Sequence, residues 1–225
     1  MSKVSKNNFP YNGIIFDSKE EIQFYIFLRD IKNLGLILDF EYQPSSFLLI
    51  PKAEIEESYH TKSGKLKIKT KTLYRDHSYT ADFKVIVNPE TFYASPIYQN
   101  GKLNVNNLTN TFYVDVKGSY NKFGGDRIFP IHQKMVYWKF KEHVNKIIPD
   151  ELFLRIGYVP EELRWMKNRK EKTLYTKYLG LKSLEELSTK NVKTINNNKK
   201  TINVGFLPDL KDGKNNCKQG SPIKL

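Results

Sequence analysis

Apolar residues recur along this chain at two spacings, and each spacing predicts a different element. Between Ser18 and Gly35 the apolar positions fall three and four residues apart, which predicts a broadly buried helix. Ser18 is a favourable N-cap, Glu21 follows three residues later as in a capping box, and Gly35 is a stop signal. We therefore expect the first helix to begin directly after Ser18.

Alternating or short continuous apolar runs predict strands in the rest of the chain. The predicted strands are 36–50 with a kink at Pro44, 79–87, 112–117 and 151–159. Residues 129–145 predict a second amphipathic helix, and Pro160 begins a further one. The core-facing positions expected on the second helix are Ile131, Met135, Trp138 and Val144. Helix, four strands, helix and strand in this order predict an α/β fold with a central mixed sheet.

Three polar segments depart from these patterns. Residues 52–77 are rich in lysine and predict a hairpin extension or a loop, with a turn at Ser63-Gly64-Lys65. Residues 88–110 contain two prolines and predict an insertion. Residues 188–225 hold eight Lys and two Asp, a net charge of +6. We expect an α/β domain over 1–187 and a flexible basic tail over 188–225.

The whole-chain charge narrows the class of partner. The formal net charge of +13 favours a polyanion, with nucleic acid ahead of an anionic membrane, although a generally lysine-rich proteome would give the same balance. The single cysteine, Cys217, excludes a disulfide framework or a cysteine zinc site within one chain. The chain starts without an apolar signal region, and its apolar runs are too short to span a bilayer, so a cytoplasmic location is expected.

Four charged residues form the candidate site: Glu21, Asp82, Asp115 and Lys117. Each has a simpler explanation when taken alone. Glu21 can cap its helix through the Ser18 amide. Asp82 can face solvent on an edge strand. Asp115 and Lys117 can form an exposed ion pair that contributes about 0–1 kcal/mol. Glu20 stays an alternative to Glu21.

Taken together, the four residues point to a metal site. Carboxylates that converge repel one another unless a cation lies between them, and hard oxygen ligands favour Mg²⁺ or Mn²⁺. Asp115 and Lys117 are two residues apart in a predicted strand, so an ammonium group lies beside the ligand. The carbonyl of Val116 is a candidate further ligand.

The segments FDSKEEIQFY, YQPSSFLL, YTADFKV, VDVKG and FPIHQKMVYW, within residues 14–145, carry a resemblance. They resemble small phage endonucleases of the PD-(D/E)XK superfamily, which are related to Holliday-junction resolvases and to transposase endonuclease subunits. Ala81 replaces a proline before the aspartate, and the 88–110 insertion lengthens the gap to Asp115. The resemblance implies a restriction-endonuclease-like core with the order αβββαβ.

The resemblance also implies a function. It implies a Mg²⁺-dependent endonuclease, with Mn²⁺ able to substitute, that cleaves branched or junction DNA during phage or mobile-element DNA processing in a bacterial host. Glu21, Asp82, Asp115 and Val116 would hold the metal, and Lys117 would orient the attacking water. The implied DNA contacts are Gln43, Lys122, Arg127, Gln133 and Lys134.

Lysines at alternate positions in the 52–77 segment predict a further DNA contact. Lys65, Lys67, Lys69 and Lys71 would share one face of a β-ribbon, although a solvated loop explains them equally well. Two other functions stay open. One is a DNA-binding or assembly protein that does not cleave, and the other is a transposase-type subunit whose partner binds the basic tail. A homodimer is also left open.

Overall fold

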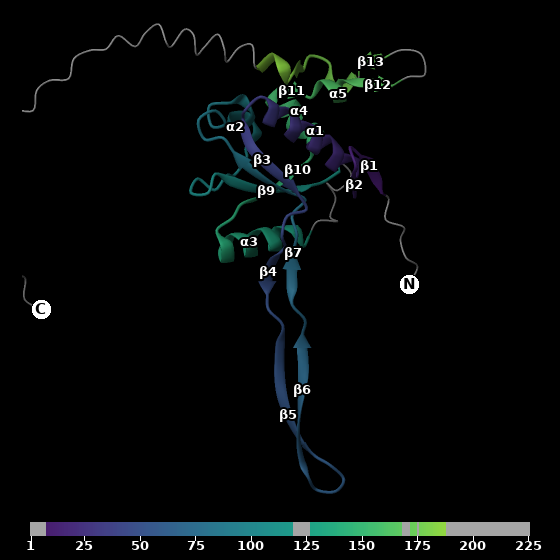
Figure 1. The fold of residues 1–225 in the computed structure, drawn as a ribbon, viewed down its shortest axis with the longest axis vertical. Helices are drawn as coiled ribbons and strands as arrows, with labels where there is room; N and C mark the ends of the chain where they lie inside the picture. The colour runs from purple at the N-terminus through teal and green to yellow at the C-terminus, as the bar shows by residue number, and fades with distance from the viewer. Residues whose placement is uncertain (1–7, 119–126, 168–171, 175, 188–225) are drawn as a thin grey trace, which may run out of the picture. The chain divides into compact units, whose positions relative to one another are not determined.

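A mixed four-stranded sheet lies at the centre of the structure, a computed structural model that describes residues 8–118, 127–167, 172–174 and 176–187 (Figure 1). In spatial order the strands are β10 (Val144–Ile147), β9 (Thr111–Val116), β8 (Phe83–Val87) and β3 (Ile37–Tyr42). β10 runs parallel to β9, whereas β8 is antiparallel to both of its neighbours. The predicted α/β fold with a mixed sheet is confirmed.

α1 (Lys19–Asn33) forms where the sequence predicts it. The Ser18 hydroxyl accepts a hydrogen bond from the Glu21 N–H, and Gly35 follows the helix with φ +71°. The apolar face of α1 packs on the sheet, where Phe24 contacts Phe83 edge-to-face at 5.3 Å between ring centroids. The helix therefore covers the main core and brings its first turn to the sheet.

A second, smaller apolar cluster lies beneath α3 (Phe129–Phe140). Here β4 (Phe47–Ile50) pairs antiparallel with β7 (His77–Tyr79). The cluster consists of Phe47, Leu49, Tyr79, Ala81, Tyr113, Phe129, Val136 and Val144. Lys139 Nζ donates to Leu48 O (2.7 Å), so α3 is joined to β4 by a polar contact as well.

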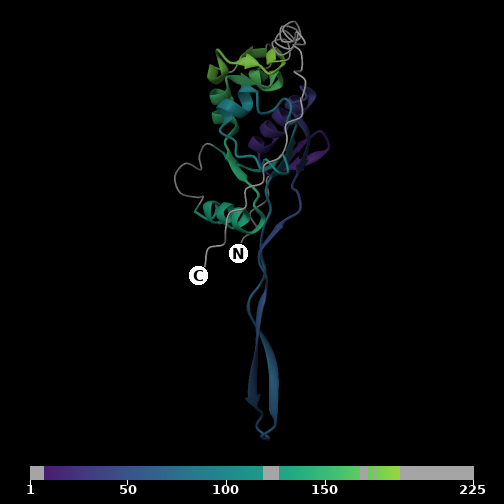
Figure 2. The same cartoon turned by 90° about the vertical axis from the view of Figure 1, so that its left-hand side faces the viewer.

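The 52–77 segment forms a hairpin of β5 (Ala53–His60) and β6 (Leu66–Tyr74). The turn includes Gly64 at φ +77°, as the sequence predicts. Figures 1 and 2 show this hairpin continuing beyond β4 and β7. In the 88–110 segment, residues of α2 (Pro96–Gly101) contribute to the main core.

Several predicted elements are wrong. The 79–87 strand is broken between β7 and β8. The 151–159 strand is instead α4 (Pro149–Ile156) followed by β11 (Tyr158–Val159). The predicted helix after Pro160 is limited to α5 (Glu161–Arg164).

The remaining elements are short. They are β1 (Phe9–Tyr11), β2 (Ile14–Phe16), β12 (Trp165–Lys167), β13 (Lys172–Leu174), the 3₁₀ helix η2 (Thr176–Tyr178) and β14 (Lys182–Ser183). β1 pairs with β2, β12 with β13, and β11 with β14.

The orientation predicted for the second helix is also wrong in part. Ile131 and Trp138 are 56% and 77% exposed, and Val144 belongs to β10 rather than to the helix. The buried residues of α3 are Phe129 and Val136. Met135 is partly buried and packs against the cluster beneath α3, as predicted.

No helix in the described part of the chain is long and apolar enough to cross a bilayer. The predicted tail, 188–225, lies outside the described residues.

Candidate active site

Asp82 lies in the bend between β7 and β8, at the end of a central strand. Its N–H donates to Val114 O (2.9 Å), and its carbonyl accepts from the Gln43 N–H (2.8 Å). The prediction of an aspartate in mid-strand is wrong, and so is the edge-strand alternative, because β8 pairs with a strand on each side. These backbone contacts fix the position of Asp82 at one end of the sheet.

Asp115 and Lys117 lie at the end of β9, beside Asp82. The antiparallel register of β8 and β9 brings Asp82 alongside Asp115, and the Val116 N–H donates to Asp82 Oδ2 (2.6 Å). Lys117 Nζ is 2.7 Å from Asp115 Oδ2. The predicted ion pair between Asp115 and Lys117 therefore forms. Because Asp115 is only 6% exposed, the simpler explanation of an exposed surface ion pair is wrong.

Glu21 brings a third carboxylate from the first turn of α1. Its carboxylate accepts hydrogen bonds from the Asp17 N–H (3.1 Å), the Ser18 hydroxyl (2.9 Å) and the Tyr42 hydroxyl (2.8 Å). The capping contact thus reaches the Asp17 amide rather than the Ser18 amide. Burial, followed by the hydrogen bond to Glu21, raises the pKa of Tyr42, which keeps this hydroxyl protonated as a donor.

The carboxylates act on one another electrostatically. Burial first, and then the negative charge of Asp115, raise the pKa of Asp82 to about 7. Glu21 adds to this rise, while the Val116 N–H and the Lys117 ammonium oppose it. At Asp82, burial and the repulsion from the two other carboxylates together outweigh the Val116 N–H and the Lys117 ammonium.

A divalent cation fits this donor set. Within the described residues, no three His, Cys, Asp or Glu side chains are grouped so as to hold a metal ion by themselves. Mg²⁺, however, commonly takes only one or two carboxylates and keeps several waters. Asp82 and Asp115 provide two hard-oxygen ligands whose mutual repulsion a cation would relieve. Val116 contacts the cluster through its N–H.

Glu20, the alternative to Glu21, also lies near the cluster. A Cβ atom placed on Gly118 would be 3.2 Å from Glu20 Oε1, so this carboxylate lies over the backbone that follows Lys117. Glu21 is the more deeply buried of the two and contributes to the raised pKa of Asp82. These observations favour Glu21 as the acid of the cluster. Glu20 is a neighbouring carboxylate that lies near Gly118, just after β9.

Among the predicted DNA contacts, Gln43 is the one that the structure brings to the cluster. Its backbone N–H binds the Asp82 carbonyl, and its side-chain amide donates to the Tyr42 hydroxyl (3.2 Å) and to Asp17 Oδ2 (3.4 Å). Arg127 is exposed just before α3. Lys122 lies outside the described residues.

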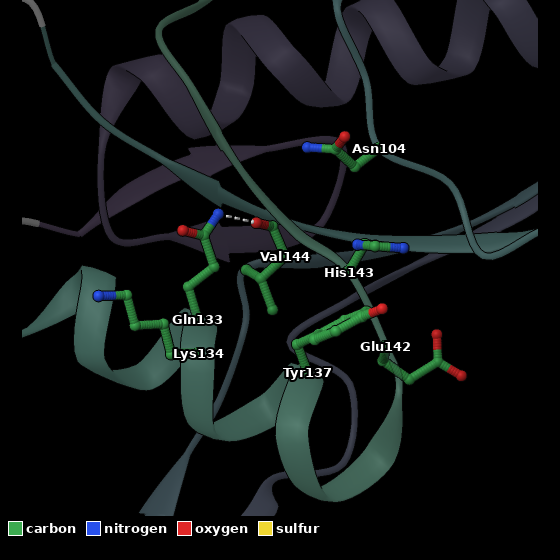
Figure 3. A pocket seen from close by; sticks show the side chains of 7 residues that line it. All are labelled: Asn104, Gln133, Lys134, Tyr137, Glu142, His143 and Val144. Carbon is green, nitrogen blue, oxygen red and sulfur yellow. Dashed lines mark hydrogen bonds between the residues drawn. The ribbon is translucent and has the colours of Figure 1, made fainter.

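Gln133 and Lys134 lie at a separate cleft. Figure 3 shows Gln133 reaching from α3 to the Val144 carbonyl, a hydrogen bond of 2.6 Å, so its amide joins α3 to β10. The cleft, of about 340 Å³, is lined by Asn104, Gln133, Lys134, Tyr137, Glu142, His143 and Val144. The carboxylate cluster does not line it. The cluster is therefore the stronger candidate site, because the residues that line the cleft have no comparable concentration of interacting charges.

A histidine pair near the cluster was not predicted. His77 Nε2 and His132 Nε2 are 2.9 Å apart, and the His132 ring also packs against Tyr79. Burial, followed by His77, lowers the pKa of His132, while Asp115 opposes this effect. The two residues are 55 positions apart in the sequence, so only the fold reveals the pair.

The fold and the site define an α/β protein with a carboxylate–lysine cluster at one end of a mixed sheet. The chain belongs to the family DUF1064, described as "Protein of unknown function", which matches residues 1–145. Searches of curated proteins and of solved structures found no match. The matched region includes the whole cluster and the hairpin.

Proposed function

We propose that this protein is a divalent-metal-dependent endonuclease that hydrolyses phosphodiester bonds in DNA through a PD-(D/E)XK-type site. One observation carries the proposal: Asp82 and Asp115 meet across β8 and β9, and Lys117 Nζ lies 2.7 Å from Asp115 Oδ2. The pKa of about 7 at Asp82 is a further support, because strongly perturbed groups of this kind concentrate at functional sites.

The order of elements supports the same proposal. α1, β3, β8, β9, α3 and β10 follow one another in the αβββαβ order of a restriction-endonuclease-like core, with the other elements inserted or appended. Glu21 lies in the first helix of that order, Asp82 directly precedes the second strand, and Asp115 and Lys117 lie at the end of the third. The sequence resemblance implies the same order of elements, and this agreement supports the proposal.

Each residue of the cluster has a distinct task in the proposed reaction. Asp82 and Asp115 would hold Mg²⁺ or Mn²⁺, and the bound cation supplies a Lewis acid that polarises the scissile phosphate and lowers the pKa of water. Glu21, held by its three hydrogen-bond donors, places a third acid beside Asp82. The Lys117 ammonium orients the attacking water and offsets charge that develops on the phosphoryl oxygens.

The substrate class rests on charge and on the resemblance. A net charge of +13 suits a nucleic acid. The resemblance favours branched or junction DNA over a specific duplex sequence, in the cytoplasm of a bacterial host during phage or mobile-element DNA processing. Cleavage of both strands of a junction would call for a homodimer.

A cleavage assay with matched variants tests this proposal. Single-stranded, linear duplex, flap and four-way-junction DNA are incubated with the full chain and Mg²⁺, Mn²⁺ or EDTA. We compare Asp115→Asn and Lys117→Ala with Asp39→Asn and Lys32→Ala. The control pair has the same 2.7 Å separation but is largely exposed. We expect the cluster variants to lose at least about 100-fold in rate, and the controls to lose little.

Two outcomes of this assay would favour one of the two alternative functions instead. Tight DNA binding without cleavage under any metal would favour a DNA-binding or assembly protein. Cleavage that begins only when a second protein is added would favour a transposase-type subunit. Cluster variants that cut as fast as the controls would refute the assigned residues.

A further inference from the structure

The β5–β6 hairpin is exposed along almost its entire length. Every residue of β6 is exposed, and in β5 only Ala53 is partly covered. A two-stranded ribbon that packs on nothing is at best marginally stable by itself. The hairpin therefore adds little to the core, and its surface chemistry is the feature to explain.

Strand register separates the charges of the hairpin onto opposite faces. Lys67, Lys69 and Lys71 alternate along β6 and so share one face, and Lys65 has the same parity at the turn. Their cross-strand partners on that face are Tyr59 opposite Lys67, Glu57 opposite Lys69, and Ile55 opposite Lys71. We call this surface the lysine face.

The opposite face of the hairpin has the other sign of charge. Glu54 and Glu56 lie there, across from Thr72 and Thr70. Among residues 53–74, the lysine face holds four lysines and one carboxylate, Glu57, which is 2.8 Å from Lys71 Nζ. The hairpin thus presents a strip of net positive charge on one side only, which is the pattern expected for contact with a polyanion rather than for general solubility.

The base of the hairpin is fixed close to the candidate active site. β5 and β6 follow β4 and β7 as a second antiparallel pair, separated from them by residues 51–52 and 75–76, and β7 ends three residues before Asp82. On one strand, His77 contacts His132 of α3 (2.9 Å), and on the other, Leu48 O accepts from Lys139 Nζ of α3 (2.7 Å). Both strands of the base are therefore joined to α3, which links the lysine face to the site.

We propose that the lysine face binds the phosphate backbone of a DNA duplex arm next to the cleaved bond, without reading its sequence. This inference rests on the proposed function. Successive lysines on β6 are about 6.7 Å apart, about twice the axial spacing of phosphates along one DNA strand. Lysines at alternate positions of β6 therefore match the axial spacing of every second phosphate along one DNA strand. Such contacts position the protein on a duplex and give affinity that falls steeply with salt.

Two variants of the full chain with equal change in net charge test the proposal. Lys67→Gln/Lys69→Gln removes two positive charges from the lysine face, whereas Leu66→Glu/Ile68→Glu adds two negative charges to the opposite face of the same strand, across from His60 and Ser58. Binding to a fluorescein-labelled duplex and a four-way junction is measured by anisotropy in EDTA across a range of salt. Thermal unfolding and cleavage with Mg²⁺ are measured in parallel.

The lysine-face variant should bind about tenfold or more weakly near 0.1 M salt, with a salt slope smaller by about 2. The control should change much less, and both should unfold like wild type. Equal losses of DNA affinity in the two variants would show an effect of net charge and overturn the inference. If the wild-type protein still cleaves DNA in that case, the proposed endonuclease function is unaffected. Wild-type protein that neither binds nor cuts DNA would overturn both proposals. A variant that loses self-association but keeps its affinity for DNA would assign the face to a second copy of the chain instead.

Discussion

Asp82 gives a quantitative prediction about stability and pH. Its pKa rises from the ordinary 3.8 to about 7, because it is buried and because the charge of Asp115 lies nearby. A carboxyl group with a higher pKa in the folded chain binds more protons when folded than when unfolded. The free energy of unfolding of the metal-free protein should therefore fall as pH rises from about 4 to about 7. Replacing Asp82 by Asn should remove this fall.

The size of the effect follows from the same numbers. About three pH units at about 1.4 kcal/mol each give a ceiling of about 4 kcal/mol. Asp82 is partly exposed and its interaction with Asp115 is screened, so we expect about 2 kcal/mol. Asn at this position keeps an oxygen that can accept from the Val116 N–H. Asp82→Asn should thus be about 2 kcal/mol more stable than wild type at about pH 8, and equally stable at about pH 4.

Urea unfolding in EDTA, followed by circular dichroism at several pH values, measures this difference. Asp39→Asn is the matched control. The hydrogen bond from Lys32 lowers the pKa of Asp39, so the Asp39 carboxyl is ionised in both the folded and the unfolded protein above about pH 5. Histidine titration is common to all three proteins and cancels in the comparison. Mg²⁺ should stabilise the wild type more at about pH 8 than at about pH 5, and should stabilise Asp82→Asn little. Parallel pH curves for wild type and Asp82→Asn would refute the electrostatic argument.

Three further predictions concern the site and its support. Glu21→Gln should lower cleavage at least about tenfold, whereas Glu20→Gln should leave it nearly unchanged; initial rates with Mg²⁺ measure this, and the reverse order would make Glu20 the functional acid. Phe83→Ala should destabilise the domain by about 3–5 kcal/mol, since Phe83 is 0% exposed in the main core; a urea midpoint close to that of wild type would contradict its place there. His132→Gln should cost about 1 kcal/mol at about pH 8 and less at about pH 5, because a lowered pKa makes the folded state lose stability as pH falls. A cost for His132→Gln that is equal at both pH values would show that the contact with His77 does not depend on titration.

Local signals located some elements and left others ambiguous. α1 was predictable because its N-cap, its apolar spacing and Gly35 all agree. The 151–159 segment was misassigned as a strand although Pro149 begins α4 and Gly157 ends it at φ +78°. Leu152, Phe153 and Ile156 are buried on one face of α4, a helical spacing that a short apolar run conceals. The predicted helix over 129–145 overlaps the start of β10, a strand of only four residues that the helical spacing conceals.

The site was predictable as a set of residues but not as a geometry. The sequence contains Asp115 and Lys117 at strand spacing, and the structure places their charged groups 2.7 Å apart. The bend at Asp82 and the hydrogen bond from Tyr42 to Glu21 depend on strand pairing and on contacts between distant segments. Trp138 shows that helical spacing alone can also predict burial wrongly. Its spacing on α3 suits a core position, but α3 buries only Phe129 and Val136, and the Trp138 side chain is 77% exposed.

The paired base of the β5–β6 hairpin also bears on how this chain tolerates changes in length. Because β4 and β7 close the segment between them, residues can be removed in matched pairs from the two hairpin strands without moving Asp82. Side chains alternate between faces, so deleting two residues from each strand keeps every lysine on its side, whereas deleting one from each turns the remainder over. The reach of the hairpin is therefore free to vary in steps of two residues per strand, independently of the chemistry at its base.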